Sequence, residues 1–137
     1  MKATELKGKT IAFAGSGGLD SCTIARWLTD LGVEVICFTA DLGQPDEDDT
    51  DAIRQRMLKA GAADFVLLPV QEAIAEIGLQ VIHAQACYEG RYWNTTGIAR
   101  CVLTQAMIQE MQKRGLTIFS HGATGRGNDQ VRFQLIT

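Results

Sequence analysis

The chain has 137 residues, of which 46% are hydrophobic and 21% are charged, and its formal net charge is −3. This composition is typical of a globular domain with a sizeable core, and the lack of a basic stripe argues against a dedicated nucleic-acid binder. No apolar run is long enough to span a membrane, and residues 1–5 lack the apolar core of a signal peptide, so we expect a cytoplasmic protein without a membrane partner.

The first predicted elements are a short buried strand, Lys9–Ala14, and a helix, Cys22–Leu31, joined by a glycine-rich loop. The loop reads Ala14-Gly15-Ser16-Gly17-Gly18-Leu19-Asp20-Ser21. Glycines allow positive φ and let a ligand approach the backbone closely. The free N–H groups at the start of a helix favour an anion, and the hydroxyls of Ser16 and Ser21 add donors. The loop therefore predicts a phosphate or pyrophosphate site.

The residues of this loop distinguish it from two better-known phosphate loops. A P-loop requires a lysine and a Ser or Thr after its last glycine, and neither is present. A dinucleotide fingerprint requires a third glycine where Asp20 stands. The stretch Ser-Gly-Gly-Leu-Asp-Ser instead resembles the pyrophosphate loop of the ATP pyrophosphatases, which cleave ATP between the α and β phosphates. A plain glycine turn is the alternative.

The middle of the chain alternates strands and helices. Val33–Thr39 is nearly continuously apolar, which is typical of a parallel strand covered on both sides. A loop from Ala40 leads to the acidic run 46–51, which indicates the start of a helix ending near Ala60, with a Mg²⁺ site as the weaker alternative. Further along, we expect a strand at 64–68 and a helix at 71–86.

The stretch Tyr88–Gly97 breaks this pattern, because it gathers aromatic, amide, hydroxyl and guanidinium groups without a period. It predicts a binding loop for a small polar ligand, with a surface loop of packed aromatics as the alternative. A long helix (98–114), a strand (116–119), a second glycine-rich loop (120–130) and a last helix (131–136) are expected to follow.

This alternation predicts an open parallel α/β sheet, Rossmann-like, with helices on both faces and strand order 3-2-1-4. Ligands bind such sheets where the order reverses, outside the carboxyl ends of the strands. The two glycine-rich loops follow the first and fourth strands. We therefore expect the segments near residues 17 and 125 to lie side by side and to rim one pocket.

Three blocks together resemble the amino-terminal part of argininosuccinate synthase: residues 14–21, residues 39–44, and His121 to Asp129 with Arg132. The resemblance implies the fold of the adenine nucleotide alpha hydrolases and a single nucleotide-binding domain over residues 1–137. The family's second, synthetase domain and its oligomerisation helix would lie outside this sequence. Family members join citrulline to aspartate through a citrullyl-adenylate and release AMP and pyrophosphate, in arginine biosynthesis. The resemblance also implies Mg²⁺ and, for the full-length enzyme, a homotetramer.

Site residues follow from the resemblance position by position. The ATP contacts would be Ala14, Gly15, Ser16, Gly17, Gly18, Leu19, Asp20, Ser21, Cys22, Ala40, Arg100, His121 and Gly122. The citrulline and aspartate contacts would be Tyr92, Thr96, Gly97, Thr124, Asn128, Asp129 and Arg132. Ser16, Asp20 and Arg100 are the candidates for stabilising the transition state, and no protein metal ligand is predicted.

Two positions depart from the family pattern. Cys22 replaces a hydroxyl residue, and Gly97 stands where many members have Ser or Thr. Two other functions stay open on the sequence alone: another ATP pyrophosphatase of this superfamily, or an ATP-binding module without catalysis. We expect the 137-residue chain to bind ATP weakly and to be inactive alone.

Overall fold

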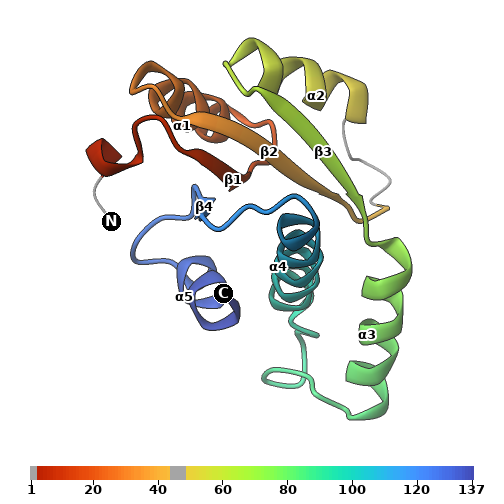
Figure 1. The fold of residues 1–137 in the computed structure, drawn as a ribbon. Coiled ribbons are helices and arrows are strands. Elements are labelled where there is room, and N and C mark those ends of the chain that lie inside the picture. Colours follow the sequence, from red (N-terminus) through yellow and green to blue (C-terminus); the bar gives the residue numbers. More distant parts are fainter. Residues whose placement is uncertain (1–2, 44–48) are drawn as a thin grey trace.

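The computed structural model describes residues 3–43 and 49–137, which form a parallel sheet flanked by helices (Figure 1). The strands are β1 (Thr10–Ala14), β2 (Glu34–Asp41), β3 (Asp64–Pro69) and β4 (Phe119–His121). The helices are the 3₁₀ turn η1 (Ala3–Leu6), α1 (Leu19–Asp30), α2 (Thr50–Lys59), α3 (Gln71–His83), α4 (Thr95–Lys113) and α5 (Asn128–Ile136). The observed order β3-β2-β1-β4 confirms the predicted order 3-2-1-4.

Helices cover both faces of the sheet, with α1 and α2 on one side and α3, α4 and α5 on the other (Figure 1). Successive side chains of a strand point to opposite faces. In β1, Ile11 and Phe13 therefore enter the core beneath α1 and α2, while Ala12 enters the core on the α4 side. All three are fully buried, which explains why the strand is apolar without alternation.

The reversal of strand order brings the two glycine-rich loops together. Strand β1 lies between β2 and β4 and pairs in parallel with both. Its last residue, Ala14, is in register with Phe38 on one side and with His121 on the other. Since both loops start at this register position, they leave the same edge of the sheet as neighbours, as predicted.

Several predicted boundaries were wrong. Helix α1 begins at Leu19 instead of Cys22, and α3 ends at His83 instead of Ala86. The fourth strand lies at 119–121 instead of 116–119, because Gly115 (φ +67°) ends the α4 segment and the Leu116 N–H still bonds to the Met111 carbonyl at 2.9 Å. His121 is thus a strand residue. Helices α4 and α5 each begin three residues earlier than predicted, so Thr96 and Gly97, and likewise Asn128 and Asp129, lie in first helical turns.

The segment after β2 is described only in part. Ala40 and Asp41, expected in a loop, continue the strand. Residues 44–48, with most of the acidic run and its alternative Mg²⁺ site, lie outside the described residues. Asp49 accepts a hydrogen bond from the Asp51 N–H at 3.0 Å and caps α2. The described part of the run therefore confirms a helix start.

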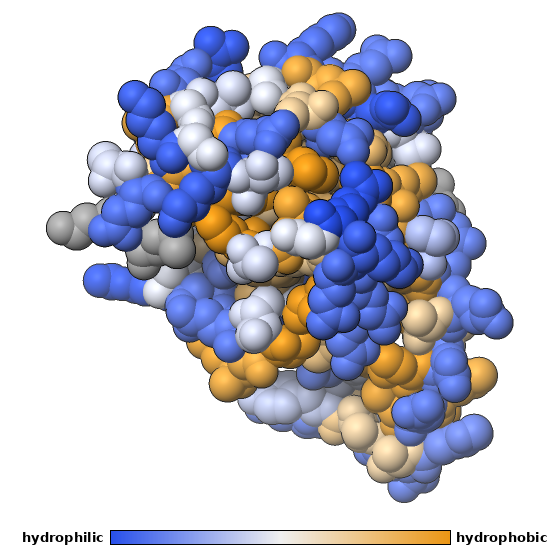
Figure 2. Space-filling view, viewed as in Figure 1, coloured by the Kyte–Doolittle hydropathy of each residue, from blue (hydrophilic) through white to orange (hydrophobic). Residues whose placement is uncertain are grey.

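Helix α3 stands at the edge of the sheet and buries no side chain completely (Figure 1). Ile74 and Ile77 pack on the α4-side core, whereas Leu79 and Ile82 are more than half exposed. Hydrophobic and hydrophilic residues mix on this side of the molecule (Figure 2). Within residues 3–43 and 49–137, none of the helices combines the length and apolarity that a bilayer crossing needs.

Candidate functional site

A cavity of about 410 Å³ opens at the carboxyl ends of the central strands. Its lining residues are Ala14, Gly15, Ser16, Asp20, Ser21, Phe38, Thr39, Ala40, Leu42, Arg100, Leu103, Gly122, Ala123, Asp129 and Phe133. Both glycine-rich loops contribute to this wall, the first through Gly15 and Ser16 and the second through Gly122 and Ala123. The predicted convergence of the two loops on one pocket is confirmed.

Gly15 is fixed by β2. Its N–H donates to the Phe38 carbonyl at 3.0 Å, and its own carbonyl accepts from the Thr39 hydroxyl at 2.6 Å. A Cβ at this position would lie 2.8 Å from Cys37 Sγ, so only glycine fits without a shift in the core. Burial raises the pKa of Cys37 to about 12, so its thiol remains protonated and acts as packing. The floor of the cavity is therefore a rigid continuation of the sheet.

Gly17 is held by helix α2. Its φ is +71°, and a Cβ would lie 2.7 Å from Ile53 Cγ2. Arg56 Nε donates to the Gly17 carbonyl at 3.0 Å, and the Cys22 thiol lies 3.6 Å from the same oxygen. The Gly17 carbonyl is thus engaged by side chains of both α1 and α2. Sequence reasoning missed Arg56, because its contact joins residues 39 positions apart.

The second half of the first loop is the first turn of α1, not a loop. Gly18 is the N-cap with φ −74°, and no described side chain caps the helix. The Ser21 hydroxyl donates to the Gly18 carbonyl at 2.9 Å, so it is already engaged. Asp20 and Ser21 line the cavity, while Leu19 is 83% exposed. An uncapped helix start beside a cavity offers backbone N–H donors to an anion.

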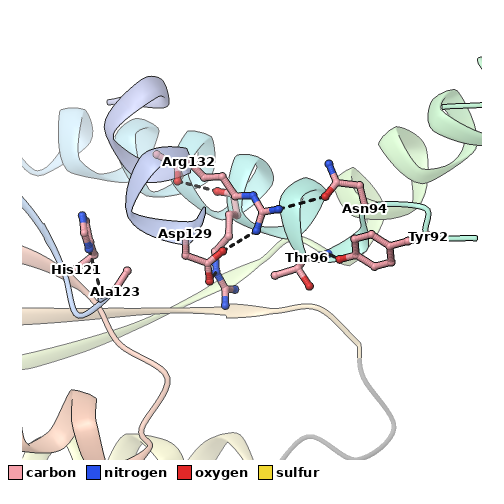
Figure 3. Close-up of polar contacts among 9 residues, drawn as sticks. Tyr92, Asn94, Thr96, His121, Ala123, Asp129 and Arg132 are labelled. Atoms are coloured by element: carbon pink, nitrogen blue, oxygen red, sulfur yellow. Dashed lines mark hydrogen bonds and ion pairs between the residues drawn. The ribbon is translucent and has the colours of Figure 1, made fainter. Parts of the chain in front are cut away.

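The second loop is anchored by His121. Its Nδ1 accepts the Ala123 N–H at 3.2 Å (Figure 3). Its ring stacks on Phe133 with centroids 4.7 Å apart. Burial lowers the pKa of His121, so at neutral pH the ring is uncharged with its proton on Nε2. Gly122 follows in close contact with α1, since a Cβ there would lie 2.9 Å from Ile24 Cδ1.

A row of charges joins α4 to α5 at the cavity. Arg100 Nε lies 3.1 Å from Asp129 Oδ2, and Arg132 Nη1 lies 2.8 Å from Asp129 Oδ1. Burial pushes the pKa of Asp129 upward, but the Arg132 hydrogen bond and the Arg100 charge outweigh it and hold the pKa below its usual value. Asp129 is therefore an ionised carboxylate between two guanidinium groups.

The row continues into the segment before α4 (Figure 3). Arg132 Nη2 donates to Asn94 Oδ1 at 3.2 Å, and the Tyr92 hydroxyl accepts the Thr96 N–H at 3.1 Å. Asn94 is the N-cap of α4 in the left-handed region (φ 53°), yet its side chain does not cap the helix. Gly97 leaves room for that side chain, since a Cβ would lie 2.7 Å from the Asn94 amide. Sequence reasoning included Asn94 in the binding stretch without singling it out.

The predicted site residues fall into two groups. Those that line the cavity are Ala14, Gly15, Ser16, Asp20, Ser21, Ala40, Arg100, Gly122 and Asp129. Those that do not are Gly17, Gly18, Leu19, Cys22, His121, Tyr92, Thr96, Gly97, Thr124, Asn128 and Arg132. Among the second group, His121 hydrogen-bonds to the lining residue Ala123, and Arg132 to the lining residue Asp129. In the described ranges, no three His, Cys, Asp or Glu side chains cluster as metal ligands would.

Comparison with known proteins gives one consistent family. The family profile described as "Arginosuccinate synthase N-terminal HUP domain" matches residues 10–137. The chain is 42% identical over 130 residues to the argininosuccinate synthase of Saccharomyces cerevisiae and 40% identical over 131 residues to that of Aquifex aeolicus. It is 43% identical over 128 residues to that of Rhodopirellula baltica. These matches cover 93–95% of the chain but only 30–32% of the relatives.

The fold has a counterpart among solved structures. The NAD⁺ synthetase of Burkholderia pseudomallei superposes with a TM-score of 0.57 at 14% identity, covering 96% of this chain and 66% of that one. At this identity the likeness concerns the fold alone, an α/β sheet with flanking helices. The family follows from the sequence profile and from the three relatives. The chain belongs to the argininosuccinate synthase family and corresponds to its N-terminal HUP domain.

Proposed function

We propose that this chain is the ATP-binding part of an enzyme that ligates citrulline and aspartate to argininosuccinate, releasing AMP and pyrophosphate. The observation that supports it most is the cavity shared by two glycine-rich loops that lie about a hundred residues apart in sequence. A ligand that fills this cavity would contact both loops. ATP fits this description, because its polyphosphate can contact one loop while its flat base lies on an apolar wall.

The two ends of ATP suit different walls of the cavity. The phosphates would lie against Ser16 and the uncapped start of α1, where N–H donors and the helix dipole favour negative charge. Arg100 would add charge-assisted hydrogen bonds. The base would lie against the apolar wall made by Phe38, Ala40 and Leu42. This arrangement leaves the α-phosphate near the middle of the cavity.

The chemistry needs charge stabilisation more than proton transfer. The citrulline ureido oxygen attacks the α-phosphorus and pyrophosphate leaves; the aspartate amine then displaces AMP from the adenylate. Charge develops on the phosphate oxygens, where fixed N–H donors and Arg100 stabilise it. Mg²⁺ bound to the phosphates would neutralise part of their charge.

The amino-acid substrates would lie at the rim formed by the first turns of α4 and α5. Tyr92, Thr96, Gly97 and Arg132 are the proposed citrulline contacts. Thr124, Asn128 and Asp129 are the proposed aspartate contacts, and Asn128 would also lie near citrulline. Arg132 donates hydrogen bonds to both Asp129 and Asn94, which supports a single surface for the two amino acids. Because the chain spans only about a third of its relatives, we expect further contacts from the rest of the enzyme.

Two measurements test the proposal. Calorimetry of the 137-residue chain should detect saturable ATP binding, and no AMP should form when citrulline and aspartate are added to the chain alone. The chain should also replace the matching 130 residues of the S. cerevisiae relative, and the chimera should then release AMP only with both amino acids present. A chain that binds no ATP would contradict the proposal. ATP binding with no AMP release by a folded chimera would favour a non-catalytic ATP-binding module.

A further inference from the structure

The two carboxylate oxygens of Asp129 accept hydrogen bonds from two different arginines. Its Oδ2 accepts from Arg100 Nε on α4, and its Oδ1 accepts from Arg132 Nη1, one turn further along α5. The Arg100 and Asp129 side chains are both about one-third exposed and both line the cavity. Arg132 does not line it. One carboxylate thus bonds to an arginine that lines the cavity and to an arginine that does not.

Arg100 is the one cationic side chain among the described residues that line the cavity. Its Nε is engaged by a carboxylate of this chain. A guanidinium forms its strongest hydrogen bonds with phosphate or carboxylate and presents its donors in a planar fork. A polyphosphate that enters the cavity therefore meets an arginine that already has an anionic partner.

We propose that Asp129 is an internal counterion of Arg100, and that nucleotide polyphosphate displaces it. ATP carries several negative charges where Asp129 carries one, so Arg100 gains more Coulomb energy by turning to the phosphates. Arg132 keeps its hold on Oδ1. Oδ2 is then released on a carboxylate that stays in place, and it can accept a hydrogen bond from a cationic amine at the rim.

This exchange couples the two ligands of the cavity. Nucleotide binding creates the acceptor for an ammonium group, and by reciprocity the ammonium ligand strengthens nucleotide binding. Without nucleotide, Asp129 is neutralised by both arginines and attracts an amine weakly. The inference rests on the proposed function, in which ATP occupies the cavity and an amino-acid amine approaches Asp129.

Calorimetry of ATP binding to four chains tests the competition: the parent, Asp129→Asn, Arg100→Gln and the double variant. A partly exposed ion pair of this kind opposes its competitor modestly, so Asp129→Asn should bind ATP about 1.5- to 5-fold more tightly than the parent. In the Arg100→Gln background the same substitution should have no such effect. Tightening of equal size in both backgrounds would show only a general loss of negative charge, and it would overturn the proposal.

Asp64→Asn is the matched control. Asp64 also pairs with an arginine, Arg114, at 3.0 Å, but neither residue lines the cavity. Its substitution should leave ATP affinity unchanged. If the parent binds ATP and Asp129→Asn binds it equally or more weakly, the counterion role is wrong while the proposed function stands. If the parent binds no ATP, both fail.

A measurement on the parent chain avoids dependence on a variant's folding. The Arg100 Nε–H signal in a ¹H–¹⁵N NMR spectrum reports the partner of that donor. It should shift on ATP addition, and the side-chain carboxyl ¹³C signal of Asp129 should shift at the same ATP concentrations. An Arg100 signal that is unaffected by saturating ATP would overturn the exchange.

Discussion

Ala14 and His121 are register partners in the parallel ladder between β1 and β4, although 106 residues of sequence separate them. Each is the last residue of its strand, and a glycine-rich loop leaves from each. Their pairing places both loops at one edge of the sheet and closes one cavity between them. The position of the candidate nucleotide site is thus a property of strand order.

Gly17→Ala should destabilise the chain and weaken ATP binding. The backbone at Gly17 has φ +71°, which costs an L residue about 1–2 kcal/mol, and the new Cβ would also press on Ile53. We expect a loss of about 2 kcal/mol or more in the free energy of unfolding by urea denaturation. Gly18→Ala is the control, because φ there is −74° and the nearest atom is 3.5 Å away. Equal losses in the two variants would contradict the account of Gly17.

Arg56→Gln should destabilise the first glycine-rich loop. The variant removes a charged donor from the Gly17 carbonyl, which corresponds to about 1.5 kcal/mol at a part-buried site. We expect weaker ATP binding by calorimetry together with the loss of stability. Arg26→Gln removes an exposed arginine that pairs with Asp30 on α1, and it should change neither quantity beyond error. ATP affinity that is identical in Arg56→Gln and the parent would remove Arg56 from the loop's support.

His121 should make the free energy of unfolding fall as pH drops below the ordinary His pKa of about 6.5. Burial lowers its folded pKa below the ordinary value, so the unfolded chain takes up the proton first as pH falls. The contribution of neutral His121 to the free energy of unfolding is complete above pH ~6.5, and it is lost as pH falls through the folded pKa. Protonation of Nδ1 also ends its hydrogen bond with the Ala123 N–H. Urea denaturation at a series of pH values measures the slope.

His121→Gln is the control for this dependence. The variant lacks the titrating ring, so its stability should change less as pH falls below about 6.5. Asp129 also has a lowered pKa, but its contribution is lost only near and below the usual range for Asp, about pH 4. A parent and a His121→Gln chain with the same slope below about pH 6.5 would rule out the buried, neutral His121.

Gly78→Ala should stabilise the chain. Gly78 lies inside α3, and no atom lies within 4 Å of the point where an alanine Cβ would stand, so alanine adds about 1 kcal/mol through helix propensity alone. Gly115 is equally open, but its φ is +67° at the end of α4, so Gly115→Ala should destabilise by a similar amount. Thermal unfolding of both variants checks the opposite signs. A change of the same sign in both would contradict this account.

The strand order could be predicted from sequence because it depends on short apolar runs and on crossovers long enough for parallel pairing. The loop after β1 could be predicted because Gly15, Gly17 and Gly18 stand between a strand and a helix. Boundaries were less predictable. Gly127 looks like part of a loop, yet it is the N-cap of α5, so Asn128 and Asp129 are helical.

The contacts that organise the site could not be predicted, because they join distant segments through side chains. Arg56 reads as an ordinary cation near the end of a helix until the fold brings it to Gly17. Arg100 and Asp129 were each predicted as ligand contacts, but their pairing across 29 residues depends on how α5 packs on α4. Asn94 is one of several polar residues in the predicted binding stretch, and only the fold directs its amide to Arg132.

The central claim is that one nucleotide contacts both glycine-rich loops. Titration of the ¹⁵N-labelled chain with ATP, followed by backbone amide NMR shifts, tests it most directly. The account predicts that amides of residues 15–21 and 122–129 shift together with one dissociation constant, while those of residues 114–118, away from the cavity, stay unchanged. Shifts confined to one loop, or centred on residues 114–118, would contradict it.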